Sequence, residues 1–258
     1  MPREQFAFYP SLKSMPVIVS GGASGIGEEI VRSFAAQDSK VGFVDIAADK
    51  GRRLEAELRA TGRTVRFVHC DITDVGAYKA AIAKLEEENG PTLALVNNAA
   101  DDRRYTYDKI TPEVWEWSIG VNLRHSFFAA QATAPGMIAA GRGSIINFGS
   151  IAWMIMLPEL APYSASKAAM HGMSRSLAKE LGPHGVRVNT VVPGWIMTEK
   201  QLSQWVGPKE LELVGRQQAM KGLLRPPDVA RMVLFLAADD GRMLSGQVFV
   251  VDGGWAHG

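Results

Sequence analysis

Short apolar runs alternate with longer amphipathic stretches along most of this chain. The apolar runs are rich in Val and Ile and lie at 16–21, 40–45, 64–70, 93–98, 144–149, 187–193 and 247–253. Helical periodicity fills the intervals, at 26–36, 48–60, 75–89, 112–139, 163–181 and 227–237. Nearly continuous apolar strands that alternate with helices are typical of a parallel sheet covered on both faces. We therefore predict an α/β fold, with about seven strands in a single-domain, doubly wound parallel sheet and helices on both faces.

Composition and charge narrow the class of protein. The 258 residues are 47% hydrophobic and 21% charged, and the net charge is +1. This balance gives no electrostatic reason to expect a nucleic acid or an anionic membrane surface as partner. No apolar run approaches the ~20 residues of a membrane span. The single cysteine, Cys70, allows no intrachain disulfide. We expect a cytoplasmic protein, with residues 1–14 as an N-terminal arm and 15–258 as one domain.

The first expected strand runs into a glycine-rich turn, SGGASGIGEE at 20–29. Gly21, Gly25 and Gly27 have the spacing GxxxGxG at the junction with the first helix, with Ser24 and Ile26 among them. Glycines there permit a tight turn and let a pyrophosphate approach the backbone and the helix N-terminus, where free N–H groups favour anions. The pattern predicts a phosphate cradle in a Rossmann-like sheet.

An acidic residue ends the second expected strand. Asp45 follows Gly27 by 18 residues, which is where a dinucleotide-binding fold places an acid on the adenosine ribose. A carboxylate accepts hydrogen bonds from two ribose hydroxyls but repels a 2′-phosphate. No Arg or Lys occupies 22–24 or 46–48 to offset that repulsion. We therefore predict NAD rather than NADP, with Asp45 and Ile46 beside the adenosine.

Four motifs occur in order along the chain. They are the glycine pattern, VNNAA at 96–100, YSASK at 163–167 and VVPG at 191–194. Together they resemble the short-chain dehydrogenase/reductase family over about residues 15–255. The resemblance implies an NAD(P)-dependent oxidoreductase acting on CH–OH groups, with a substrate lid at about 195–222. It also implies a homotetramer built on the helices at 112–139 and 163–181.

Tyr163 and Lys167 are four residues apart, so a helix places them on one face. A free tyrosine has a pKa near ~10 and is a poor base at neutral pH. A neighbouring ammonium group is expected to lower that pKa by favouring the phenolate. The family resemblance implies that Tyr163 exchanges the proton, while Lys167 tunes it and binds the nicotinamide ribose. It further implies that Ser150 binds the reacting oxygen and that Asn122 supports a water-mediated proton path.

The resemblance implies further cofactor contacts at the ends of the later strands. They lie near the adenine, along the segment after the fourth strand, and around the nicotinamide. Their residues are Asp71, Ile72, Asn98, Ala99, Ala100, Pro193, Gly194, Ile196 and Thr198. Ala100 stands where the family commonly has glycine, so its methyl group tightens the approach of the backbone to the ribose.

Three stretches, at 97–105, 121–137 and 146–173, resemble a narrower group, the bacterial aldose 1-dehydrogenases. This resemblance implies oxidation of xylose, arabinose, galactose or fucose at C1 to the aldonolactone. A sugar needs polar partners for its hydroxyls and an aromatic or apolar surface for its C–H face. The predicted substrate contacts are Asp102, Arg104, Ser150, Trp153, Glu159, Tyr163 and Trp195, with Asp101, Arg103, Met154 and Gln201 close by.

Two other functions stay open on the sequence. One is a carbonyl reductase such as a 3-oxoacyl thioester reductase, whose acidic carrier partner would need a basic patch; only Arg103 and Arg104 offer one. The other is a non-catalytic dinucleotide sensor, a class that typically lacks the tyrosine or the lysine. No metal site is predicted, because His69 and Cys70 are adjacent in a strand and point to opposite faces.

Overall fold

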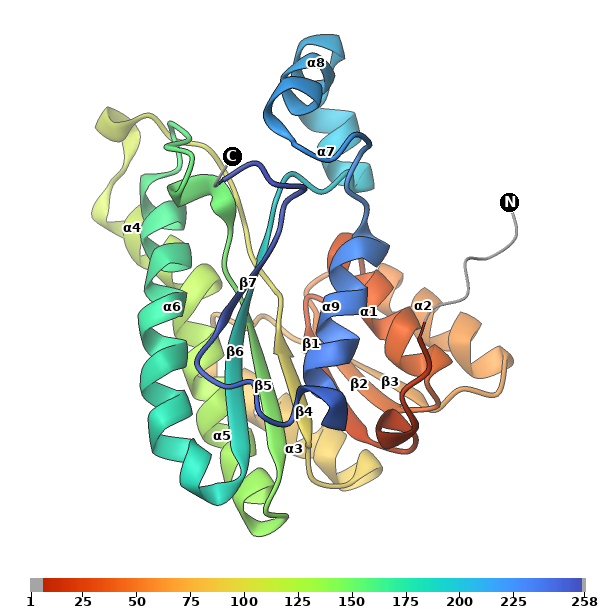
Figure 1. The fold of residues 1–258 in the computed structure, drawn as a ribbon. Coiled ribbons are helices and arrows are strands. Elements are labelled where there is room, and N and C mark those ends of the chain that lie inside the picture. Colours follow the sequence, from red (N-terminus) through yellow and green to blue (C-terminus); the bar gives the residue numbers. More distant parts are fainter. Residues whose placement is uncertain (1–6, 257–258) are drawn as a thin grey trace.

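The computed structural model describes residues 7–256 and contains one seven-stranded sheet (Figure 1). The strand order is β3-β2-β1-β4-β5-β6-β7, and every neighbouring pair is parallel. The strands are β1 (Pro16–Ser20), β2 (Lys40–Asp45), β3 (Val65–His69), β4 (Ala94–Asn97), β5 (Gly143–Phe148), β6 (Val186–Pro193) and β7 (Val248–Val251). The predicted doubly wound parallel sheet is confirmed.

Helices cover both faces of this sheet. One face carries α1 (Gly25–Ala36), α2 (Ala48–Ala60) and α9 (Pro226–Ala237), and the other carries α3 (Val75–Asn89), α5 (His125–Ala139) and α6 (Ala161–Leu181) (Figure 1). Helix α4 (Pro112–Ile119) lies beside α6. Within residues 7–256, no helix has both the length and the apolar character needed to cross a membrane.

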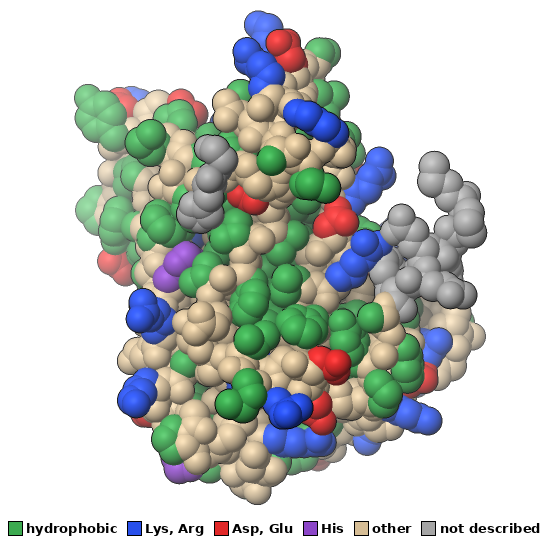
Figure 2. Space-filling view, viewed as in Figure 1, with side chains coloured by type: hydrophobic (Ala, Val, Ile, Leu, Met, Phe, Trp, Pro, Cys, Tyr) green, Lys and Arg blue, Asp and Glu red, His purple; other side chains and the backbone are tan. Residues whose placement is uncertain are grey.

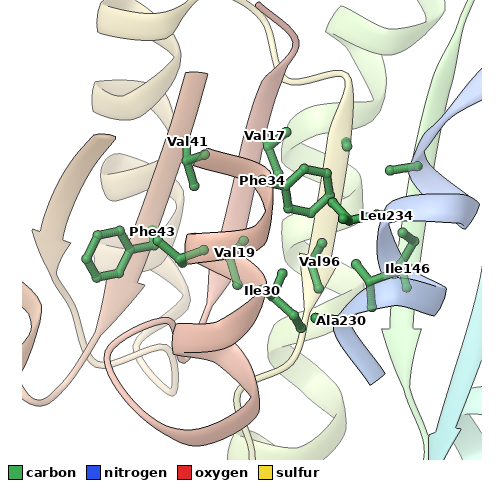
Figure 3. Close-up of a cluster of buried hydrophobic side chains, with 14 of the residues drawn as sticks. Val17, Val19, Ile30, Phe34, Val41, Phe43, Val96, Ile146, Ala230 and Leu234 are labelled. Carbon is green, nitrogen blue, oxygen red and sulfur yellow. The ribbon is translucent and has the colours of Figure 1, made fainter. Parts of the chain in front are cut away.

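A cluster of buried hydrophobic side chains forms the core between the sheet and its first face (Figure 3). Ile30 and Phe34 of α1 and Leu234 of α9 pack against strand residues such as Val19 and Val96. All five side chains are buried. Burying a side chain of this size stabilises the fold by about 1.5–3 kcal/mol. This packing fixes the N-terminus of α1 directly after the end of β1.

The sheet reverses its winding at β1, which pairs with β2 on one side and with β4 on the other. Ligands of open parallel sheets bind at such a switch point, beyond the carboxyl ends of the strands. The turn after β1, Asp45 at the end of β2 and Asn98 after β4 all lie at this edge. The topology therefore gathers the predicted cofactor residues without any further device.

The structure differs from the predicted helices in two places. The stretch 112–139 is not one helix, because a π-helical turn, Gly120–Arg124, separates α4 from α5. A π turn inserts one extra residue within a continuous helical stretch, and the approximate helical periodicity of the sequence did not show its position; such turns are frequent at functional sites. The predicted lid contains α7 (Glu199–Gln204) and α8 (Pro208–Gln217), two helices that were not predicted from the sequence and that bury little.

The predicted lid and the predicted N-terminal arm lie outside the alternating strands and helices of the sheet. Helices α7 and α8 project above the carboxyl edge of the sheet, and Figure 2 shows Lys and Arg side chains at the tip of this projection. Their role as a lid stays a prediction. Residues 1–6 of the predicted N-terminal arm lie outside the described residues. Its remainder packs on the domain, since Leu12 is fully buried and Tyr9 donates its N–H to Gln37.

Candidate active site

A cavity of about 510 Å³ opens at the carboxyl edge of the sheet. It extends from the turn after β1 and the end of β2, past the segments after β3, β4 and β5, to α6 and α7. One end is therefore built from the glycine turn and Asp45, and the other from polar and aromatic side chains. A cavity of this size and shape can hold an extended cofactor together with a small substrate.

The glycine turn fits a pyrophosphate. Gly25 has φ +59°, and a Cβ at Gly27 would lie 1.9 Å from the Gly21 carbonyl oxygen. Ser24, the N-cap of α1, makes no side-chain hydrogen bond to the helix, so its first N–H groups stay free for an anion. Asn98 donates its Nδ2 to the Ser20 and Gly21 carbonyls at 3.1 Å and fixes the turn. The close approach at Gly27 is the feature that a dinucleotide cradle requires.

Gly27→Ala is expected to weaken dinucleotide binding strongly, by about tenfold or more, because the added methyl group must displace the Gly21 backbone. Titration calorimetry with the dinucleotide measures the effect. Gly172→Ala is the matched control, since no atom lies within 4 Å of its added Cβ, also on a helix. Equal binding by the two variants would contradict this assignment of the turn.

Asp45 is held rigidly at the cofactor end of the cavity. Its Oδ2 accepts the Ala23 N–H at 2.9 Å, and its Oδ1 accepts the Ala47 N–H at 2.8 Å. Each oxygen keeps a further lone pair. Ile46, which also lines the cavity, is 66% exposed. The carboxylate is thus aimed by the backbone and can accept two more hydrogen bonds.

Tyr163 and Lys167 lie on α6 and both line the cavity. The Lys167 Nζ lies 5.7 Å from the centre of the Tyr163 ring and donates a hydrogen bond to the Phe148 carbonyl at 3.0 Å. The helical spacing therefore brings the two side chains together, and the end of β5 anchors the ammonium group.

The electrostatics differ from the prediction. Burial raises the pKa of Tyr163 to about 12; a hydrogen bond with Ser150 lowers it in part, and the charges of Asp102 and Asp101 raise it. Burial also lowers the pKa of Lys167 to about 7. The net direction is opposite to the expected lowering, because desolvation of the buried phenol is the largest effect on its pKa.

Ser150 lies at the cavity, whereas Asn122 is buried away from its lining. Ser150 lines the cavity, and its Oγ accepts the Ala152 N–H at 3.1 Å. Asn122 is fully buried on the π turn and lies outside the cavity lining of the described residues. Its Oδ1 accepts the Asp101 N–H at 2.9 Å, and its Nδ2 donates to the Asp101 carbonyl at 3.0 Å. Asn122 thus clamps the loop after β4.

The cavity includes nearly all the predicted cofactor residues. Gly25 is the exception, since it lies beside Thr198 behind the lining. The others that line the cavity are Gly21, Ser24, Ile26, Gly27, Asp45, Ile46, Asp71, Ile72, Asn98, Ala99, Ala100, Tyr163, Lys167, Pro193, Gly194, Ile196 and Thr198. The assignment of each residue to a cofactor contact stays a prediction.

The predicted substrate residues divide into two groups. Asp102, Arg104, Ser150, Tyr163 and Trp195 line the cavity. Among the described residues, Trp153, Glu159 and Met154 do not belong to the lining. The Trp153 ring packs edge-on against His171, 5.3 Å between centroids. Glu159 has a left-handed backbone conformation, with φ +64°, which the sequence pattern did not predict. Its carbonyl accepts a hydrogen bond from the Tyr105 N–H.

Several residues that line the cavity were not predicted from the sequence as site residues. They include Lys200 and Leu213 from the projecting helices, Trp117 from α4 and Trp255 from the C-terminal turn. The Trp255 ring lies 6.4 Å from that of Trp195, so the two form an aromatic pair at the cavity. Trp117 packs under the Arg103 guanidinium at 4.2 Å. No spacing rule links these positions, because only the tertiary fold brings them to the same opening.

A family model described as enoyl-(acyl carrier protein) reductase matches residues 21–256, most of the chain. The chain belongs to the short-chain dehydrogenase/reductase family. It is accordingly an oxidoreductase of CH–OH groups that uses a nicotinamide dinucleotide.

Relatives of this dehydrogenase match it over nearly its whole length. A D-xylose 1-dehydrogenase from Caulobacter vibrioides is 43% identical, covering 96% of this chain and 98% of that protein. The "Probable galactose dehydrogenase GalD" from Rhizobium meliloti is 41% identical, covering 98% of each. A solved structure, a blue fluorescent protein from a metagenomic library in complex with NADPH, is 34% identical. That likeness covers 95% of this chain and 99% of the other, with a TM-score of 0.88.

Proposed function

We propose that this enzyme oxidises an aldose at C1 to the aldonolactone with NAD. The observation that carries the proposal is the substrate end of the cavity, where a tyrosine, lysine and serine face polar and aromatic side chains. The names of the two sugar dehydrogenases among its relatives support the same substrate class.

In the proposed reaction, Tyr163 takes the proton from the anomeric hydroxyl, and Ser150 donates a hydrogen bond to the same oxygen. Bound NAD supplies the hydride acceptor for the hydrogen on C1. Loss of the proton and the hydride converts the C1–OH carbon into the lactone carbonyl. Lys167, held by the Phe148 carbonyl, orients the ribose and the tyrosine. Asn122 holds the loop after β4 in place and supports the path by which the proton leaves.

A substrate panel tests this function. NAD reduction is measured with xylose, arabinose, galactose and fucose, and NAD(P)H oxidation is measured with 3-oxoacyl thioesters and ketosteroids. At least one aldose is expected to exceed every other compound by about tenfold or more in kcat/KM. A preference for 3-oxoacyl thioesters would favour the reductase alternative. The absence of turnover with any aldose would contradict the proposal.

Asp45→Ser is expected to lower the preference for NAD over NADP by about tenfold or more, because it removes the charge that repels a 2′-phosphate. The ratio of kcat/KM for the two cofactors measures this effect. Asp49→Ser is the control, since Asp49 is an exposed acid in the first turn of α2 and pairs with Arg52 at the surface. An unchanged ratio for Asp45→Ser would show that other residues select the cofactor.

The assembly and location stay predictions. We propose a homotetramer, supported by exposed apolar side chains on the expected contact helices, Trp115 on α4 and Phe127 on α5. Light scattering coupled to size exclusion tests it. The cytoplasmic location expected from the sequence is a separate prediction.

A further inference from the structure

At the mouth of the cavity, the loop after β4 contacts α7, although the two segments are far apart in the sequence. The Lys200 Nζ donates to the Asp102 Oδ1 at 2.6 Å, and the Gln201 Nε2 donates to the Asp102 Oδ2 at 2.9 Å. We call Asp102, Lys200 and Gln201 the mouth clamp. The Gln201 Oε1 in turn accepts the Trp195 indole N–H at 2.8 Å. One carboxylate therefore joins the loop to the helix and, through Gln201, to an aromatic wall.

The mouth clamp has hydrogen-bonding capacity to spare. A carboxylate accepts about four hydrogen bonds, of which Asp102 uses two on the clamp. A lysine ammonium donates three, and Lys200 gives one of them to Asp102. All three clamp residues line the cavity. A hydroxyl group both donates and accepts, so a carboxylate beside an ammonium group complements two neighbouring hydroxyls.

Both carboxylates at the mouth have cationic partners. Burial would raise the pKa of Asp102, but the hydrogen bond and charge of Lys200, with the Gln201 hydrogen bond, hold that pKa below its usual value. Asp102 is therefore an ionised acceptor at neutral pH. Asp101 is paired with Arg103, whose Nε lies 3.2 Å from the carboxylate. Arg104 packs over the Trp205 ring at 4.5 Å. Each carboxylate thus has a cationic partner, so an uncharged polar ligand need not bring a counterion to either of them.

We propose that the mouth clamp is the specificity-determining element of the enzyme, binding two adjacent hydroxyls of the aldose away from C1. The inference rests on the proposed function and identifies the side chains that would distinguish one aldose from another. A substrate without these hydroxyls gains nothing from Asp102 and Lys200. Sites built to hydrogen-bond a hydroxyl discriminate strongly against analogues that lack it. The clamp also draws α7 toward the loop, so substrate recognition and closure of the mouth use the same atoms.

Monodeoxy analogues of the best aldose test the proposal in the full-length enzyme. In the wild type, removal of a hydroxyl bound by the clamp is expected to lower kcat/KM by about tenfold or more, mainly through KM. In Asp102→Asn and Lys200→Met, the same removal is expected to cost about twofold or less. Lys209→Met is the matched control, since Lys209 is an exposed lysine of α8 outside the cavity lining and should keep the wild-type penalty.

The pH profile gives a second measurement. The charge of Asp102 opposes ionisation of Tyr163. Asp102→Asn is therefore expected to move the rising limb of kcat/KM to lower pH, with Asp101 and Lys167 left in place. This shift reports the charge of Asp102 near Tyr163, whereas the deoxy penalties report its contact with the substrate. Suppose that aldoses are oxidised, but that removing a hydroxyl lowers kcat/KM equally in the wild type and in all variants. That result would contradict the mouth-clamp proposal and leave the proposed function intact. If the wild type oxidises no aldose, the proposed function falls with it.

Discussion

Tyr163→Phe is expected to lower kcat for sugar oxidation by about 10²- to 10⁴-fold, the usual effect of removing a general acid–base group. The Tyr163 oxygen, which has a hydrogen bond with Ser150, is the proposed acceptor of the substrate proton, and phenylalanine keeps the ring in its place. Burial holds the pKa of Tyr163 at about 12, so turnover of the wild type should rise with pH as the phenolate forms. That dependence should be absent from the residual activity of the variant.

Dinucleotide affinity separates loss of chemistry from loss of structure. Tyr163→Phe should bind the cofactor within a few-fold of the wild type, since the glycine turn and Asp45 are untouched. Tyr107→Phe is the matched control, because Tyr107 is 89% exposed and lies outside the cavity lining of the described chain. Full activity in Tyr163→Phe would overturn the mechanism, whereas cofactor binding without any turnover in the wild type would favour a non-catalytic dinucleotide sensor.

Lys167→Met is expected to impair activity and raise stability together. Turnover should fall by about 10²- to 10³-fold, as when one preorganised donor is removed from an active site. The pKa of Lys167 is about 7 in the fold, against an ordinary value of 10.5, so the fold disfavours its charged form. The destabilisation is fully present below pH 7 and disappears as the pH rises toward 10.5. Methionine removes this cost but leaves the Phe148 carbonyl without its partner.

Removing the buried charge stabilises Lys167→Met, and losing the hydrogen bond to Phe148 destabilises it. Together these effects are expected to raise the free energy of unfolding by about 1–3 kcal/mol at neutral pH. Thermal or urea unfolding at pH 7 and at pH 10 measures it, and the gain should shrink at the higher pH. Lys179→Met is the matched control, because Lys179 is an exposed lysine on the same helix. A variant less stable than the wild type at pH 7 would show that the ammonium group is not strained by burial. Such a trade between stability and activity is common at catalytic positions.

Much of the fold followed from the sequence, for a local reason. Apolar runs and helical periodicity report which faces of each element are buried, and these define strands and helices without knowledge of their neighbours. The seven predicted strands and the boundaries of α2 and α3 are confirmed. The π turn at Gly120–Arg124 was missed because a single inserted residue is a smaller feature than the helical pattern over 112–139 could resolve. Helices α7 and α8 were missed because they bury little, with Val214 the buried residue of α8.

The candidate site divides in the same way. The glycine turn, Asp45 and the pair Tyr163 and Lys167 depend on short spacings along one turn or one helix, so the sequence alone determined them. The tertiary structure decided the pKa values, since desolvation depends on everything packed around a side chain. It also decided the substrate end, where Asp102 meets Lys200 and Trp195 meets Trp255 across long separations in the chain. Local spacing cannot encode such meetings, because they depend on how the whole sheet stacks its loops along one edge.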